Sequence, residues 1–158
     1  MNKRFSDYLN GLTPKRRDIA EEAVRTFLAC ENENMESLSC GVDVYNLCRD
    51  MTLLDVEHFD VLLMNRSYKL IKRFTLGIGG LTEVSVDIRV MIREACLNNA
   101  TVIAVVHNHP SGSIRPSNCD DQITQAIRKA CDIMRITFLD HVIIGNGAYY
   151  SYHENGKI

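Results

Sequence analysis

The sequence contains no run approaching the roughly 18 consecutive apolar residues that a membrane-spanning helix needs, so a transmembrane helix is excluded. Residues 1–7 include basic side chains, but no apolar run follows them, which argues against a signal peptide. Positive charge is not in excess, because 18 Lys and Arg stand against 20 Asp and Glu and give a net charge of −2. A protein that grips nucleic acid through its whole surface is usually basic, so only a local basic patch is left open.

Cysteine pairs of the CxxC kind are also lacking, although the chain has six cysteines. A chain of 158 residues with no secretion signal does not need disulfides, so we interpret the cysteines as reduced thiols that mostly fill the core. Hydrophobic residues make up 46% and charged residues 24%, which is enough apolar material for a core and excludes disorder as the default. We expect a cytoplasmic protein with no membrane partner.

Apolar periodicity predicts a chain of helices and strands. Thr13 followed by Pro14 is typical of a helix start, and the β-branched run 101–106 is typical of a strand buried on both faces. The first two strands and the last two are expected to form hairpins, and the order of elements indicates an α/β fold with a mixed β-sheet flanked by helices. The helices are expected near 14–30, 42–51, 88–97 and 118–134, and the strands near 59–64, 68–76, 101–106, 138–144 and 148–152.

The most informative stretch is HNHPSGSIRPSNCD, residues 107–120, at the end of the most apolar strand. Side chains two apart share a face of a strand, so His107 and His109 point the same way and Asn108 points the other way. Two imidazoles on one face can bind one metal ion, and Asp120 in the first turn of the next helix can complete a His-His-Asp set. Three protein ligands leave a fourth position for water, as in a catalytic zinc site.

The same residues also fit a purely structural interpretation. Ser117 and Asp120 have the spacing of a capping box at the start of a helix, where the helix dipole favours an acid. An HxH run on a strand can be two hydrogen-bonded polar residues. From the residues alone both interpretations stay open, and Ser117 is either a plain N-cap or a hydrogen-bond donor to bound water or a developing oxyanion.

The run HNHPSG followed by PS and then D resembles the RadC-type branch of the JAB/MPN metalloprotease superfamily. The JAMM signature of that superfamily is a distant Glu, then HxH, seven residues, Ser, two residues and Asp. The segments 57–63 and 139–145 are similar to RadC as well, and the resemblance covers residues 36–158 as one domain behind an N-terminal helical segment, residues 1–35. It implies a JAB/MPN-like, cytidine-deaminase-like architecture, a Zn²⁺ cofactor and hydrolysis of an amide bond in a peptide or protein.

The resemblance also implies a role for each matching residue. His107, His109 and Asp120 match the zinc ligands of the motif. Glu57 matches the glutamate that takes a proton from the zinc-activated water and passes it to the leaving amine. Ser117 matches the serine that steadies the tetrahedral intermediate formed when this water attacks the carbonyl.

The glutamate of the motif is the least constrained by spacing. Spacing alone does not choose Glu57 over Glu83, which follows a glycine run and remains the alternative. Glu94 lies beside Arg93 within a predicted helix and is most simply a solvated charge.

Two features depart from the RadC pattern. Residues 1–35 are too short for the helix-hairpin-helix module that often precedes this domain, so the chain resembles a short form and DNA binding through that module is not expected. Asp87, Ile88 and Arg89 stand where the family often shows His-Pro-Arg, so the arginine is kept and the histidine of that pattern is absent at this position.

Other polar residues near these motifs have plainer interpretations. His141 is expected to be a hydrogen-bonded structural histidine, with bracing of the site as the alternative. Cys119 is expected to be a packed thiol, with metal binding as the alternative. The cluster of Lys69, Lys72 and Arg73 is expected to be a solvated strand face, with polyanion binding as the alternative.

Three functions are therefore weighed. The first is a zinc-dependent metallopeptidase or isopeptidase. The second is a RadC-like factor associated with DNA repair that binds or processes nucleic acid, which the net charge of −2 does not support. The third is a non-catalytic MPN interaction module.

Overall fold

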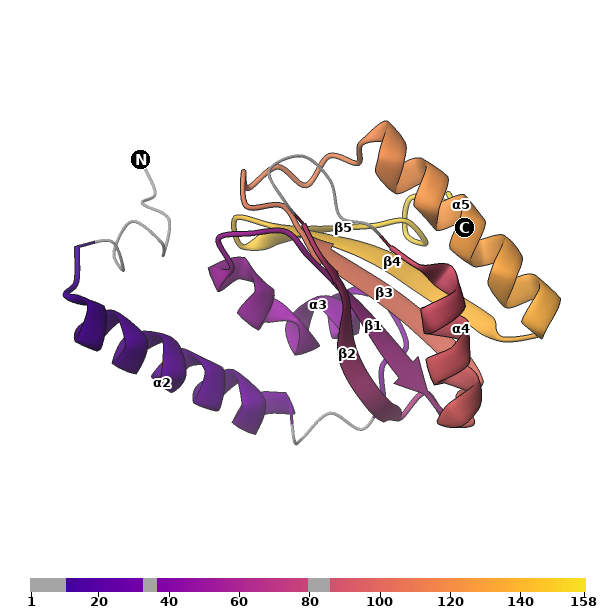
Figure 1. Cartoon of the computed structure of the whole chain (residues 1–158), viewed down its shortest axis with the longest axis horizontal. Helices are drawn as coiled ribbons and strands as arrows, with labels where there is room; N and C mark the ends of the chain where they lie inside the picture. The colour runs from indigo at the N-terminus through magenta and orange to yellow at the C-terminus, as the bar shows by residue number, and fades with distance from the viewer. Residues whose placement is uncertain (1–10, 33–36, 80–85) are drawn as a thin grey trace.

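The computed structural model describes residues 11–32, 37–79 and 86–158. Its elements follow the predicted order, and the expected helix over 42–51 divides into a short α-helix and a 3-10 turn. In chain order they are α2 (Pro14–Asn32), α3 (Gly41–Leu47), the 3-10 helix η1 (Arg49–Leu53), β1 (His58–Met64), β2 (Leu70–Ile78), α4 (Ile88–Leu97), β3 (Val102–Asn108), α5 (Asn118–Met134), β4 (Thr137–Gly145) and β5 (Ala148–Ser151) (Figure 1). No helix within the described ranges is long and apolar enough to cross a membrane.

The five strands form one mixed sheet in the order β2-β1-β3-β4-β5. Strands β3 and β4 are parallel, while the other neighbours, including both predicted hairpins, are antiparallel. All seven residues of β3 are buried, as predicted, because it lies at the centre of the sheet with helices over both faces. The α/β prediction of a mixed sheet flanked by helices is confirmed.

Each face of the sheet has its own core. On one face, Val44 and Met51 of the α3–η1 segment pack on Leu62 and Val106. On the other face, α4 and α5 pack on residues such as Val105, which has the same parity along β3 as His107. Because side chains alternate along a strand, His107 projects toward the α5 face, and Asn108 projects toward the α3 face.

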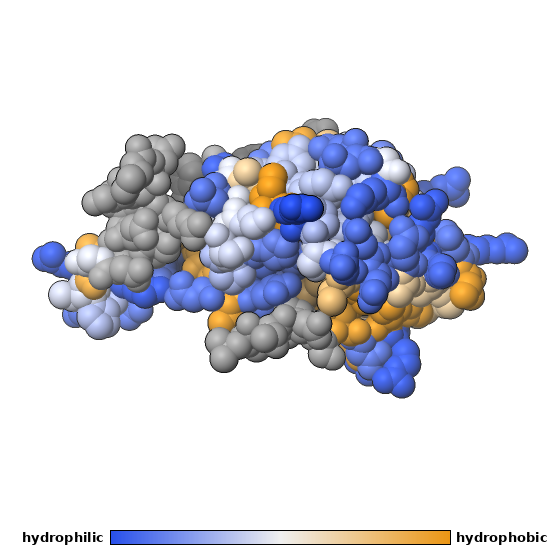
Figure 2. Space-filling view, turned by 90° about the horizontal axis from the view of Figure 1, so that it is seen from above, coloured by the Kyte–Doolittle hydropathy of each residue, from blue (hydrophilic) through white to orange (hydrophobic). Residues whose placement is uncertain are grey.

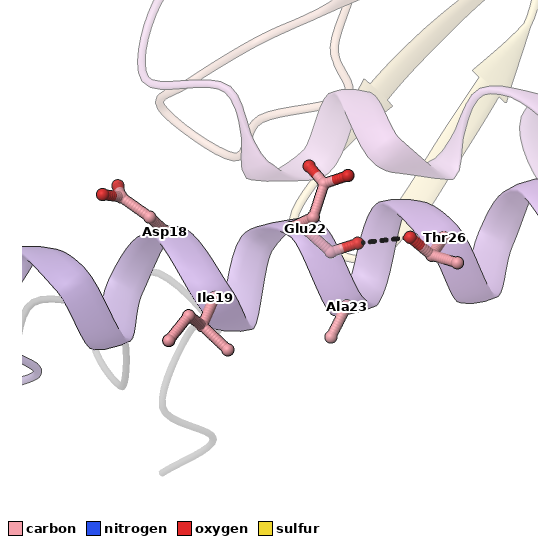
Figure 3. A pocket seen from close by; sticks show the side chains of 5 residues that line it. All are labelled: Asp18, Ile19, Glu22, Ala23 and Thr26. Atoms are coloured by element: carbon pink, nitrogen blue, oxygen red, sulfur yellow. Dashed lines mark hydrogen bonds between the residues drawn. The ribbon is translucent and has the colours of Figure 1, made fainter.

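Helix α2 lies beside the sheet and the helices that cover its two faces, and is not part of either core (Figure 1). Its start at Pro14 confirms the predicted N-terminus. Figure 3 shows Ile19 and Ala23 pointing away from the side on which Asp18 and Glu22 lie, and Ile19 is 61% exposed. The apolar spacing thus predicts the helix correctly, but Ile19, one of its apolar positions, is exposed rather than buried.

Cys30 lies outside the side chains that the structure describes, and the other five cysteines fill the core less than expected. Cys48 and Cys131 are fully buried, and burial raises the pKa of each thiol to about 12. Cys96 and Cys119 are instead exposed, and Cys40 is intermediate.

Seen from above, the molecule presents a largely hydrophilic face that is broken by apolar patches (Figure 2).

Candidate metal centre

Four side chains from separate parts of the fold converge at one end of the central strands. Glu57 lies just before β1, His107 is in β3, His109 directly follows β3, and Asp120 lies in the first turn of α5. Antiparallel pairing of Phe59 with His107 brings the start of β1 beside the end of β3. One ligand atom from each of the four residues lies within 4.8 Å of the others.

The spacing of these atoms suits a small tetrahedral ion. His107 Nε2 lies 3.0 Å from His109 Nε2 and 3.2 Å from Asp120 Oδ1, and His109 Nε2 lies 3.6 Å from Asp120 Oδ2. Ligands about 2.0–2.1 Å from a tetrahedral zinc ion lie about 3.3 Å from one another, which is in the middle of this range. Glu57 Oε1 is farther from His107 Nε2, at 3.9 Å.

The ring of His109 is oriented by the loop that follows it. His109 Nδ1 lies 2.8 Å from the carbonyl oxygen of Ser113, which can only accept, so Nδ1 carries the hydrogen. In the neutral ring Nε2 then has a lone pair, aimed at the space it shares with the Asp120 carboxylate. Lone pairs and negative charge that converge in this way repel one another unless a cation or a proton lies between them. The donor set of two imidazoles and a carboxylate therefore fits zinc.

The electrostatics of Asp120 and His109 point in the same direction. Burial acts to raise the pKa of the Asp120 carboxyl, but the hydrogen bonds that His107 and His109 donate when a proton is also bound at Nε2 outweigh burial and hold that pKa well below its ordinary range. The hydrogen bond with Asp120 raises the pKa of His109, with burial opposing. Asp120 is therefore an anion at neutral pH, which a metal ligand must be.

Asp120 also serves as the helix cap that the spacing predicted. Ser117 Oγ accepts a hydrogen bond from Asp120 N at 3.1 Å, and Asp120 Oδ2 accepts one from Ser117 N at 2.7 Å. The structural and the metal-binding interpretations therefore describe one arrangement. The capping box fixes the carboxylate at the helix start, where its oxygens face both histidines.

Asn108 holds the segment that carries Glu57, which the sequence interpretation did not foresee. Its Oδ1 accepts from His58 N at 2.8 Å, and its Nδ2 donates to Val56 O at 3.0 Å, so one buried amide binds the backbone on both sides of Glu57. Gly79 N donates to Glu57 O at 2.7 Å. A signal was present, because a buried amide in the middle of HxH needs polar partners on the opposite face.

Three of the four converging side chains, Glu57, His109 and Asp120, line an open cavity of about 630 Å³, called the hollow below. Glu57, His109, Ser117 and Asp120 form its polar end. Its apolar wall consists of Phe59, Val86, Ile123 and Ala126. Cys119 also lines the hollow and is exposed, so the expectation of a packed thiol is wrong. It directly follows the first residue of α5, whose opening turn faces the hollow rather than the core.

The other acidic candidates lie elsewhere. Glu83, the alternative to Glu57, is outside the described residues. Glu94 is on α4 and forms ion pairs with Lys72 at 2.8 Å and Arg93 at 3.1 Å. It is a paired charge rather than a purely solvated one.

The basic cluster is not a uniformly solvated face. Arg73 is partly buried and forms ion pairs with Asp60 and Asp50, both at 2.8 Å. Lys72 is paired as described above, while Lys69 is exposed. The expectation is wrong for Arg73, because β2 packs beside β1 and places this guanidinium against the buried carboxylate of Asp60.

The remaining departures have simple structural explanations. Asp87 accepts a hydrogen bond from Arg89 N and caps α4, so the residue that interrupts the family pattern begins a helix. His141 is buried and hydrogen-bonded, as expected of a structural histidine, but its partner is His107, one of the predicted ligands.

Comparisons with known proteins identify the family of this chain. A model of the family described as the RadC-like JAB domain matches residues 38–157. Three similar curated relatives are each called UPF0758 protein. The protein of Streptococcus gordonii is 44% identical over 98 residues, which are 62% of this chain and 43% of that protein. The protein of Porphyromonas gingivalis is 42% identical over 109 residues, or 68% and 48%.

The third relative, from Haemophilus ducreyi, is 32% identical over 136 residues, which are 85% of this chain and 61% of that protein. The chain thus spans about half the length of the curated relatives that it matches. The family model covers the whole sheet and the four convergent side chains. This chain therefore belongs to the RadC-like JAB domain family.

Proposed function

We propose that this domain is a zinc-dependent hydrolase of amide bonds, a metallopeptidase or isopeptidase of the JAMM type. The observation that carries the proposal is the convergence of Glu57, His107, His109 and Asp120 at the polar end of an open hollow. His107, His109 and Asp120 would hold the ion, and the hollow leaves a fourth side accessible to water and substrate. A zinc ion in such a site lowers the pKa of its water ligand to about 7, which makes a nucleophile available at neutral pH.

Glu57 is the proposed general base and acid. Its side chain is 27% exposed and lines the hollow, so its carboxylate can reach a water molecule held beside His107. The carboxylate takes one proton from that water as the C–O bond forms, and delivers it to the amide nitrogen as the C–N bond breaks. The amide of Asn108 fixes the backbone on both sides of Glu57 and keeps this carboxylate in place.

Ser117 is the proposed donor to the oxyanion. Its Oγ already accepts a hydrogen bond from Asp120 N, so its own hydrogen remains to be donated. Ser117 lines the same polar end as Glu57 and His109. A fixed hydroxyl at this position would stabilise the charge that develops on the carbonyl oxygen during attack.

The apolar wall formed by Phe59, Val86, Ile123 and Ala126 suits a peptide or protein substrate with an apolar side chain near the scissile bond.

DNA binding gains little support from the described residues, because Lys72 and Arg73 are paired with acids. A cytoplasmic location stays a prediction.

Metal content and hydrolysis together test the proposal. The chain purified without added metal should contain about one zinc ion, and His107→Ala/His109→Ala should lose it. The wild-type chain should cleave members of a peptide and isopeptide library, whereas Glu57→Gln, which keeps size and removes the base, should bind zinc and cleave at least about 100-fold more slowly. Failure to take up zinc on titration, or full activity of Glu57→Gln, would overturn the proposal. A zinc-binding chain that cleaves no library member would favour the interaction-module alternative.

A further inference from the structure

His141 lies behind the candidate centre and is completely buried. Its Nε2 is 2.8 Å from Nδ1 of His107, and its ring stacks on Tyr152 with centroids 4.9 Å apart and planes 7° from parallel. Its two ring nitrogens face Thr124 Oγ1 and His107 Nδ1, and neither partner carries the negative charge that a completely buried imidazolium would need. The ring is therefore neutral and has one hydrogen and one lone pair to place.

A chain of hydrogen bonds with one possible direction places that hydrogen. Thr124 Oγ1 lies 2.5 Å from the backbone carbonyl of Asp120, which only accepts, so the hydroxyl donates there. Because a hydroxyl has one hydrogen, Thr124 Oγ1 must accept from His141 Nδ1, 2.6 Å away. His141 Nε2 is then bare and accepts from Nδ1–H of His107. The last hydrogen in the chain is thus on the far side of the His107 ring from the candidate centre.

We propose that Thr124 and His141 are positioning residues that hold His107 as the tautomer whose Nε2 lone pair faces the metal. The proposal rests on the metal site proposed above. The chain of hydrogen bonds begins at the backbone of Asp120 and ends at the ring of His107, so it joins two predicted ligands through α5, β4 and β3. A shift of α5 would therefore alter both the Asp120 carboxylate and the tautomer of His107.

The choice of a neutral imidazole as partner has a physical reason. A metal-binding histidine usually donates its second N–H to a carboxylate, a backbone carbonyl or water. The polar end of the hollow already contains the carboxylates of Glu57 and Asp120. A third carboxylate in the buried position of His141 would lack solvent and a cation of its own, whereas a neutral ring accepts the hydrogen bond without adding charge.

Two substitutions of Thr124 distinguish the effect of losing the hydroxyl from the effect of changing the size of the side chain. Thr124→Val keeps the shape and removes the hydroxyl, whereas Thr124→Ser keeps the hydroxyl. Zinc affinity, measured by competition with a chelator, should fall about 10- to 100-fold in Thr124→Val and stay within about threefold of wild type in Thr124→Ser. Equal affinity of the two folded variants would overturn the proposal.

Nitrogen-15 NMR of the metal-free wild-type chain reads the tautomers directly. The spectra of the neutral rings should show His107 and His141 each with hydrogen on Nδ1 and a bare Nε2, and Thr124→Val should mix the His141 tautomers while Thr124→Ser does not. Hydrogen on Nε2 of either wild-type ring would overturn the assignment even if no variant folds. Zinc binding without hydrolysis would remove the proposed activity but leave this inference intact, since neither readout uses activity. A chain that binds no zinc removes the metal site and, with it, this inference.

Discussion

The Nε2 atoms of His107 and His109 lie only 3.0 Å apart. Both rings carry their hydrogen on the far nitrogen when they are neutral, because Ser113 O and His141 Nε2 accept there. Two lone pairs are therefore held face to face, 3.2 and 3.6 Å from the oxygens of Asp120. The fold maintains this arrangement at a cost in free energy that a bound cation removes.

Zinc should consequently stabilise the folded chain. At a free zinc concentration 100 times its Kd, the free energy of unfolding should rise by about 2.7 kcal/mol. For a chain of this size that corresponds to a rise in Tm of roughly 5–10 °C, measured by calorimetry with and without a chelator. His107→Ala/His109→Ala should show no such rise. An equal rise in both proteins would mean that zinc binds elsewhere, for example at the exposed thiols of Cys96 and Cys119.

Replacing Asn108 should separate catalysis from metal binding. Asn108→Leu leaves His58 N and Val56 O without their partner, so the segment that carries Glu57 should shift and the free energy of unfolding should fall by about 1–3 kcal/mol. Misplacing a catalytic group by about 1 Å can lower kcat about 100-fold. Zinc content should be unchanged, since Glu57 is not one of the proposed ligands.

Asn98→Leu is the matched control for Asn108→Leu. The Asn98 side chain donates to Glu94 O at the end of α4, away from the hollow. Its loss should lower stability while kcat stays near wild type. Comparable kcat in the two variants, assayed at equal zinc content, would contradict the positioning role of Asn108.

The sequence predicts the elements of this fold well because their signals are local. The helix start at Ser117, the helix near 88–97 and the buried run of β3 each depend on residues within a few positions of one another. His107 and His109 sharing a face likewise follows from strand alternation. These parts of the site needed no tertiary information.

The hydrogen-bond partners of the site residues depend on how the strands pair and in which register, which the local sequence pattern does not predict. Asn108 meets His58 50 residues away, and His107 meets His141 34 residues away. Both contacts exist because β3 pairs with β1 on one side and β4 on the other. Spacing could not choose Glu57 for the same reason, and only the family resemblance pointed to it.

Gly145 should be required for the geometry of His109. A Cβ added there would lie 2.7 Å from Gly112 O and 2.9 Å from Ser113 O, and Ser113 O is the acceptor that orients the His109 ring. Gly145→Ala should therefore displace the loop after HxH and weaken zinc binding by about tenfold or more in chelator competition. The cause is contact with backbone, which cannot move aside as a flexible side chain can.

Gly147→Ala provides the comparison for Gly145→Ala. Gly147 has φ +77°, and an added Cβ there meets nothing within 4 Å. The substitution should cost about 1 kcal/mol of stability through backbone strain, without changing zinc affinity. If both alanine variants bind zinc as wild type does, the loop does not control His109.

Alkaline pH should destabilise the chain through Cys48. Burial raises the pKa of this thiol to about 12 in the folded chain from an ordinary value of 9.0, with Arg73 opposing the rise. Above pH 9 the unfolded chain loses this proton while the folded chain retains it, so unfolding becomes more favourable. The stability contributed by the protonated thiol is complete below pH 9 and is lost as pH rises toward 12. The expected slope is about −1.4 kcal/mol per pH unit from this thiol.

Urea unfolding between pH 9 and 11 measures that slope. Cys48→Ala should start from a lower stability at pH 8, because it leaves a small cavity, but should lose stability less steeply with pH than wild type. Cys96→Ala removes an exposed thiol and should follow the wild-type slope. Parallel curves for wild type and Cys48→Ala would show that the Cys48 thiol ionises in the folded chain as readily as in the unfolded one, and that water reaches it there.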